Sequence, residues 1–258
     1  ATAAGSPKAD KPVGKGTAHA GTKIWNIGNN NAPVSSKAGP TLMVAWSPGG
    51  KYLASVGQEA KNIRSLVIKV TESASGDEVF TSPPIPGPPG PFLAWAPDGK
   101  RLAIGNRGKW IEIWDIPNNQ PLYPRKDGDR FSTVSWSPQG DQFVTGSLDK
   151  QIKIWNAATG EEVSVLGEHG APVNFARWTA DGRTLVSSGT EKTIRVWRTT
   201  TGDLTIREAG PPTCIALAPD GSRLATATAD RPIRLFDATS GQELIRLSDE
   251  SIGSTAFS

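Results

Sequence analysis

A short phrase recurs along the 258-residue chain, and this repetition constrains the fold more than any other feature. Each copy is an apolar stretch that ends in an aromatic or apolar residue and is followed, in most copies, by Ser-Pro or Ala-Pro and then Gly. The copies are Val44–Gly50, Leu93–Gly99, Val134–Gly140, Ala176–Gly182 and Ile215–Gly221, and Ala256–Ser258 begins a sixth. The landmark residues, at 46, 95, 136, 178, 217 and 257, are 39 to 49 residues apart. Self-similarity at such a period indicates a repeat architecture.

A second landmark, an apolar residue followed by an aromatic, occurs later in each unit. It stands at Ile113-Trp114, Ile154-Trp155, Val196-Trp197 and Leu235-Phe236, with another copy at Ile24-Trp25 and a degenerate one at Val70-Thr71. Polar and apolar residues alternate before it, as in Gln151 to Ile154, and this period of two is typical of a strand. Glycine-containing turns separate the segments. Each unit is therefore predicted to be four short antiparallel strands.

Four strands alone cannot bury both faces of their sheet, whereas several such units packed radially can. We therefore expect an all-β protein, a β-propeller at residues 12–258 after a flexible arm at 1–11. Five full blades are expected at 41–81, 91–123, 131–166, 173–207 and 213–247. Residues 12–37 and 252–258 are expected to form a sixth blade that joins the N- and C-terminal strands and leaves no open edge. A fragment of a seven-bladed chain is the alternative.

The two landmarks and their period of roughly 40 residues resemble the WD40-repeat β-propeller family. The family's Trp-Asp pair is present at Trp114-Asp115 and, with phenylalanine, at Phe236-Asp237. Elsewhere the pair is Trp-Asn or Trp-Arg. The turn sequences are similar to those of bacterial WD-repeat proteins. The resemblance implies a rigid scaffold that binds other proteins.

Composition argues against several classes of function. The formal charge is only +3, so we expect no nucleic-acid partner. One cysteine, Cys214, and two histidines, His19 and His169, are too few for a zinc site. No apolar run reaches the roughly 18 residues of a membrane span. We expect no cofactor, no metal, no membrane insertion and no small-molecule substrate.

The single cysteine fits a reducing compartment, so we expect a cytoplasmic protein. The chain begins at Ala1 without a methionine, which leaves a removed leader, and hence a periplasmic or membrane-peripheral location, as the alternative.

The resemblance also implies a hydrogen-bond network. In the family a loop histidine bonds to an acidic turn residue, a strand serine or threonine and the blade tryptophan. The matching residues here are His169, Glu191, Ser187 and Trp197. The sequence departs from the family pattern in two ways, because Glu168 is inserted before the histidine and Glu191 replaces the usual aspartate. We expect a structural role for this network rather than general-base catalysis.

The family's usual partner-binding face supplies candidate contact residues. One set lies four residues before the first landmark, and a second lies at the tip of the turn before the acidic residue. The two sets are Leu42, Pro91, Ser132, Asn174 and Thr213, and Arg107, Leu148, Thr190 and Ala229.

Two further features stand outside the repeat. The proline-rich stretch Ser82–Pro91 is either a stiff loop or a docking element. Eight of the nine tryptophans occupy landmarks and are expected in the core. Trp110 stands at neither landmark, so the repeat predicts neither a core nor a surface position for it.

These features favour a non-catalytic scaffold or accessory subunit of a larger protein complex. The alternatives are an enzyme acting at the central channel of the propeller, or a sensor or docking domain of a larger signalling protein.

Overall fold

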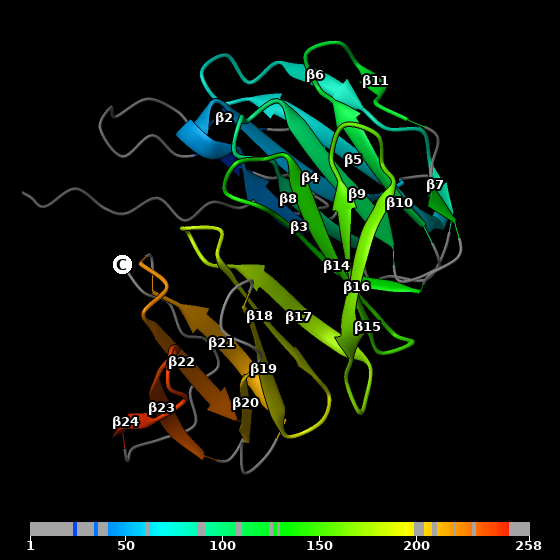
Figure 1. Cartoon of the computed structure of the whole chain (residues 1–258). Helices are drawn as coiled ribbons and strands as arrows, with labels where there is room; N and C mark the ends of the chain where they lie inside the picture. Colours follow the sequence, from blue (N-terminus) through cyan, green and yellow to red (C-terminus); the bar gives the residue numbers. More distant parts are fainter. Residues whose placement is uncertain are drawn as a thin grey trace, which may run out of the picture.

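The computed structural model describes residues 41–59, 62–86, 91–106, 110–123, 126–127, 130–198, 204–207, 211–218, 220–228 and 231–247, together with 23–24 and 34–35. Within these ranges the protein is all-β, as the sequence predicted. Five antiparallel sheets of four sequential strands follow one another along the chain (Figure 1). No helix in the described ranges has both the length and the hydropathy needed to cross a membrane.

The first two sheets each carry one extra short strand. The first runs β3 (Thr41–Trp46), β4 (Tyr52–Glu59), β5 (Asn62–Glu72) and β6 (Glu78–Thr81), with β7 (Ile85–Pro86) also paired to β5; a short 3-10 turn, η1 (Pro48–Gly50), joins β3 to β4. The second runs β8 (Pro91–Trp95), β9 (Arg101–Asn106), β10 (Trp110–Asp115) and β11 (Gln120–Pro121), with β12 (Lys126–Asp127) also paired to β10.

The other three sheets are simple four-stranded meanders. The third has β13 (Phe131–Trp136), β14 (Gln142–Ser147), β15 (Gln151–Asn156) and β16 (Glu162–Glu168). The fourth has β17 (Val173–Trp178), β18 (Thr184–Gly189), β19 (Thr193–Arg198) and β20 (Leu204–Arg207). The fifth has β21 (Pro212–Leu217), β22 (Arg223–Thr228), β23 (Arg231–Asp237) and β24 (Glu243–Arg246).

A separate antiparallel pair joins β1 (Lys23–Ile24) to β2 (Val34–Ser35). These strands belong to the segment expected in the sixth blade. The rest of that segment and residues 252–258 lie outside the described residues, as does the arm at 1–11.

The repeated glycine of the first phrase is explained by its turn. Gly140 has a φ of 74°, a left-handed conformation that favours glycine, and its amide donates to the carbonyl of Ser137 at 2.9 Å. Gly99, Gly182 and Gly221 repeat this conformation and this hydrogen bond. The turn reverses the chain between the first and second strands of each sheet.

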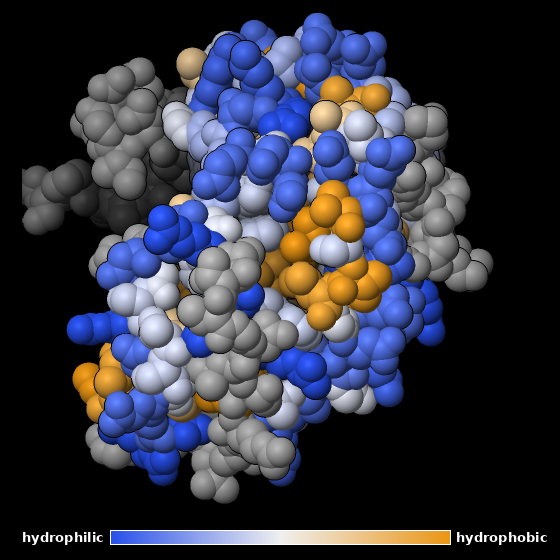
Figure 2. All heavy atoms as spheres, viewed as in Figure 1, coloured by the Kyte–Doolittle hydropathy of each residue, from blue (hydrophilic) through white to orange (hydrophobic). Residues whose placement is uncertain are grey.

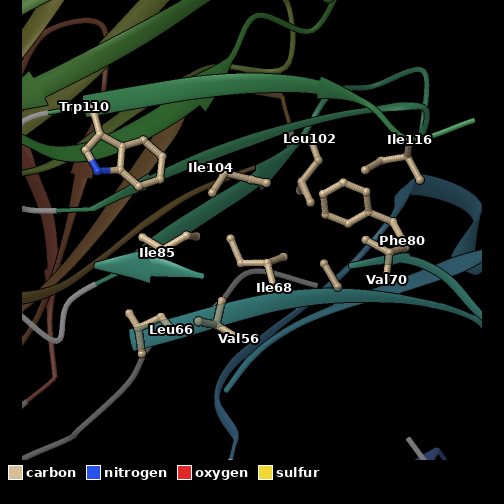
Figure 3. Close-up of a cluster of buried hydrophobic side chains, with 11 residues drawn as sticks. Val56, Leu66, Ile68, Val70, Phe80, Ile85, Leu102, Ile104, Trp110 and Ile116 are labelled. Atoms are coloured by element: carbon tan, nitrogen blue, oxygen red, sulfur yellow. The ribbon is translucent and has the colours of Figure 1, made fainter. Parts of the chain in front are cut away.

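The core is divided among the contacts between successive sheets. In the first of these contacts, Ile68 and Phe80 of the first sheet meet Leu102, Ile104 and Trp110 of the second (Figure 3). Three similar clusters join the second sheet to the third, the third to the fourth and the fourth to the fifth. Full burial of one large aliphatic or aromatic side chain contributes roughly 1.5–3 kcal/mol, so the sheets stabilise one another.

The tryptophans differ in their surroundings. Trp95 and Trp136 donate their indole N–H groups to the preceding sheet, to the carbonyls of Ala45 at 3.0 Å and Ala94 at 2.9 Å. Trp110 is only 8% exposed, which assigns it to the core. Trp46 departs from the expected core position, since half of its surface (50%) is exposed on β3 of the first sheet.

Candidate partner-binding surface

The described members of the two sets of predicted contact residues lie at one end of the sheets. The amide of Leu148, in the turn between β14 and β15, donates to the carbonyl of Arg130 just before β13, at 2.8 Å. In the next sheet the amide of Thr190 donates to the carbonyl of Pro172, just before β17, at 3.0 Å. These bonds fasten each turn to the start of the neighbouring inner strand. We call this end, with Leu42, Leu148, Asn174, Thr190 and Thr213, the loop face.

Four of the predicted residues occupy equivalent β-bulges that the sequence did not reveal. The pairing register of the inner strand shifts around each of them, so each is an extra residue with no partner directly opposite. A bulge turns a side chain away from the regular alternation of a strand. The four bulged residues are Leu42, Ser132, Asn174 and Thr213.

The side chains at these bulges differ in exposure. Leu42 is 49% exposed, and Asn174 and Thr213 are also exposed. Ser132 is buried and points inward. Its hydroxyl lies 2.9 Å from the carbonyl oxygen of Gly146 and 2.5 Å from that of Val173. Ser132 therefore links two inner strands and adds no surface to the loop face.

Two of the remaining predicted residues, Leu148 and Thr190, have described side chains, and the others do not. Thr190 is exposed and Leu148 is half-buried at its turn. Pro91 begins β8, where it pairs with Asn106, but its side chain lies outside the described residues. Arg107 and Ala229 also lie outside them.

The structure brings His169, Ser187, Glu191 and Trp197 into one hydrogen-bonded chain. The indole of Trp197 donates to Ser187 Oγ at 2.7 Å, and this hydroxyl lies 2.7 Å from His169 Nε2. His169 Nδ1 lies 2.5 Å from Glu191 Oε1. The same carboxylate oxygen accepts the hydroxyl of Thr193 at 3.0 Å. These hydrogen bonds connect the loop after β16 to β18 and to the start of β19 in the next sheet.

Burial fixes the protonation of this network. Burial lowers the pKa of His169, and the hydrogen bond to Glu191 only partly opposes it, so the ring is neutral at pH 7. Burial raises the pKa of Glu191, but the hydrogen bond from His169 and further contacts outweigh it, so its pKa is lowered. The carboxylate then accepts a hydrogen bond from Nδ1–H, and Nε2 accepts a hydrogen bond from the hydroxyl of Ser187.

A serine, a histidine and a carboxylate in series also describe the catalytic triad of acyl-transfer enzymes. Here Ser187 is fully buried and its oxygen already accepts the indole N–H of Trp197. A substrate carbonyl has no route to that oxygen. The geometry therefore favours a structural role for this network, which holds the loop after β16 to the next sheet, over nucleophilic catalysis.

A cavity of about 510 Å³ opens at the end of the inner strands opposite the loop face. Three landmark tryptophans (Trp46, Trp95 and Trp136) line it together with prolines of the adjoining turns and with Arg177. The residues that line it include no histidine, cysteine, aspartate or glutamate. Within the described ranges there is also no group of three or more histidine, cysteine or acidic side chains placed to hold a metal ion.

Two outer strands expose apolar side chains. Figure 2 shows apolar surface over the region of β16, where Val163 is 53% and Val165 46% exposed, and again near β24. On β24 and just after it, Leu244, Ile245 and Leu247 are 45%, 49% and 54% exposed.

One comparison with known proteins bears on the repeat. The family model described as WD domain, G-beta repeat matches residues 125–156 and 160–198, which include the strands of the third sheet and the first three strands of the fourth. A search of curated proteins finds no match to the chain.

Proposed function

Because residues 125–198 form a WD40 repeat domain, a class of domain that generally serves as a protein-interaction scaffold, we propose that this protein is a non-catalytic scaffold or accessory subunit. Its loop face would bind partner proteins. The observation on which the proposal rests is the row of bulged residues Leu42, Asn174 and Thr213, which are exposed at equivalent positions of three sheets.

The loop face suits recognition because its backbone is fixed. Each described turn is bonded to an inner strand, as Leu148 is to Arg130 and Thr190 to Pro172. A preorganised surface loses little conformational entropy when it binds, and this favours affinity. The exposed apolar side chain of Leu42 and the exposed amide of Asn174, at equivalent positions of two sheets, offer desolvation and hydrogen bonding to a partner.

Affinity purification from the native source, after mild cross-linking, tests the proposal. A stoichiometric partner identified by mass spectrometry is expected, and it should be lost from the double variant Leu148→Asp, Asn174→Arg. The matched control is Ala180→Asp, Gln139→Arg, which places the same charges on exposed turns at the other end of the sheets. The propeller recovered alone would overturn the scaffold function, and a partner lost equally from both double variants would overturn the loop face as its site.

We further propose that a sixth blade, formed from residues 12–37 and 252–258, closes the ring against β3. The support comes from β3 itself. Val44 is 49% exposed and Trp46 is 50% exposed at alternate positions of β3, so this inner strand carries an apolar face that none of the described residues covers. In the second and third sheets the equivalent tryptophans donate to the preceding inner strand, which indicates what Trp46 would contact.

A further inference from the structure

One position of the repeat changes the sign of its charge in a single blade. Two residues before the second landmark, a cation stands in five units, at Lys23, Lys69, Lys153, Arg195 and Arg234. In the second sheet the same position is Glu112, two residues before Trp114. The pairing of β10 with β9 is regular, and on its outer side β10 pairs with β11 and β12.

In the third and fifth sheets the cation has two partners inside its own blade. Lys153 Nζ lies 5.8 Å from the centre of the Trp155 ring and 3.1 Å from the carboxylate of Glu162 on the outer strand. Arg234 repeats this arrangement, with its guanidinium over Phe236 and its Nε bonded to Glu243 at 3.0 Å.

In the second sheet both halves of this arrangement are changed. The residue opposite Trp114 on the outer strand is Pro121, where Glu162 stands opposite Trp155. Glu112 instead accepts the indole N–H of Trp114 at 2.8 Å. Among the described residues no cation lies within ion-pair distance of Glu112. Among the described residues, the blade therefore keeps the aromatic ring and a carboxylate without the cation that accompanies them in the third and fifth sheets.

A cavity of about 190 Å³ is present at this place, between the first and second sheets. Trp110, Glu112 and Trp114 line it from alternate positions of β10, which place their side chains on one face of the strand. Pro83 and Pro84 line it from the first sheet, and both are exposed. Figure 3 shows Trp110 beside Ile85 and Ile104, which also line the cavity.

The wall of the cavity formed by the proline-rich segment is held in place. The amide of Ser82 donates to the carbonyl of Ile68 at 2.8 Å, and Ser82 Oγ accepts the amide of Ile68 at 3.0 Å. On the opposite wall Phe80 packs edge-on against the Trp114 ring, with 4.9 Å between the ring centres. The cavity is therefore preformed and needs little rearrangement to admit a ligand.

We propose that this cavity binds the basic side chain of a partner protein, a lysine or an arginine, which takes the place that Lys153 and Arg234 hold in their own sheets. Indole faces attract cations, and a half-buried carboxylate pairs with an ammonium or guanidinium group. The inference rests on the proposed scaffold function and adds one contact of the partner, in the cavity between the first and second sheets. It also gives the described part of the proline-rich segment a role as a wall of the site.

Small cations test the site without a partner. The probes are butylammonium and propylguanidinium chloride, followed through the indole N–H resonances of ¹⁵N-labelled protein. We expect a saturable shift of the Trp114 and Trp110 resonances, while Trp155, whose ring already faces Lys153, stays unchanged. Butanol and sodium chloride at equal concentration are the controls. No saturable shift, or an equal shift with butanol, would overturn the site.

Two variants separate the carboxylate from the fold. Glu112→Gln keeps an acceptor for the Trp114 indole and should weaken butylammonium binding about tenfold, which corresponds to roughly 1.4 kcal/mol. The double variant Glu112→Lys, Pro121→Glu restores the internal pair of the other blades and should abolish binding while leaving the urea midpoint equal or higher. Unchanged binding in the double variant would contradict the proposal.

Two further results identify the source of the cation and separate this inference from the scaffold function. A primary ammonium donates hydrogen bonds to Glu112 and a quaternary one cannot, so butylammonium should bind more tightly than tetramethylammonium. The reverse order would overturn the assignment to a partner side chain. If the cavity binds no cation but a partner still co-purifies, the inference fails and the scaffold function stands. If the cavity binds butylammonium but no partner co-purifies, the scaffold function fails.

Discussion

The indole nitrogen of Trp136 lies 2.9 Å from the carbonyl oxygen of Ala94 in the preceding sheet, whereas the buried indole nitrogen of Trp178 has no hydrogen-bond partner among the described residues. The two tryptophans occupy the same position of successive repeats. Identical residues at equivalent positions therefore contribute differently to the contacts between sheets.

Replacing each of these tryptophans by phenylalanine should separate the effects. Trp136→Phe loses the hydrogen bond to Ala94, while Trp178→Phe removes a donor that is already unsatisfied. We expect Trp136→Phe to lower the free energy of unfolding by about 1–3 kcal/mol more than Trp178→Phe does. Urea titration of both variants measures the difference. Equal losses would mean that the hydrogen bond between the sheets adds nothing to stability.

Acid should weaken the fold through His169. The pKa of His169 is lowered from its usual value of 6.5, so between the two values the unfolded chain binds more protons than the folded one. The contribution of neutral His169 is fully present above pH 6.5 and is lost as the pH falls below it. Glu191 acts in the same direction at lower pH, since its lowered pKa gives stability above 4.5 that is lost in acid.

The measurement is the urea midpoint between about pH 5 and pH 8, where histidine titrates. The wild type should lose stability toward pH 5, and His169→Gln should flatten this dependence. His19→Gln is the control for the second histidine and should keep the wild-type profile. If His169→Gln gives a curve parallel to that of the wild type, the network does not control the acid response.

Gly167 should tolerate no side chain. Its φ is 153°, a conformation that L residues rarely adopt, and an added Cβ would lie 2.9 Å from Cη2 of Trp197. We expect Gly167→Ala to lower the free energy of unfolding by about 1–3 kcal/mol. Gly170→Ala is the matched control, because its added Cβ meets no atom within 4 Å. The control should change the free energy by less than about 1 kcal/mol. Similar thermal midpoints for the two variants would contradict this account.

Ring closure predicts a large effect at Trp46. If the sixth blade packs on β3, Trp46→Ala in the full chain should cost about 3–5 kcal/mol, as for a buried tryptophan. Val79→Ala, on the exposed surface of β6, is the control and should cost about 0.5 kcal/mol or less. A small loss at Trp46 would show that this tryptophan stays in solvent and that no blade covers β3.

Much of the fold followed from local patterns. The alternation at Gln151 to Ile154 predicted a strand, and β15 is found there. The repeated phrase predicted the turns, and Gly140 has the left-handed conformation that such a turn requires. The paired landmarks indicated WD40 repeats, which the family model confirms for residues 125–198. Strand periodicity and turn chemistry act over a few residues, so a single sequence contains them.

The site was less accessible to sequence reasoning. Spacing placed Leu42, Ser132, Asn174 and Thr213 at one repeat position, but it could not show that each lies in a bulge or that Ser132 turns inward. The change of sign at Glu112 was visible in the aligned repeats. Its meaning required the cavity beside Trp114.

The sequence by itself determined the units, because each blade is built from turns and alternating strands whose causes are local. The tertiary structure alone decided how one unit meets the next. Trp136 donates to a carbonyl and Trp178 has no acceptor in the described part of the chain, and Trp110 is buried while Trp46 is half-exposed. These outcomes depend on the backbone of a neighbouring sheet some 40 residues away in the chain. No local pattern specifies the distance or the angle between the two sheets.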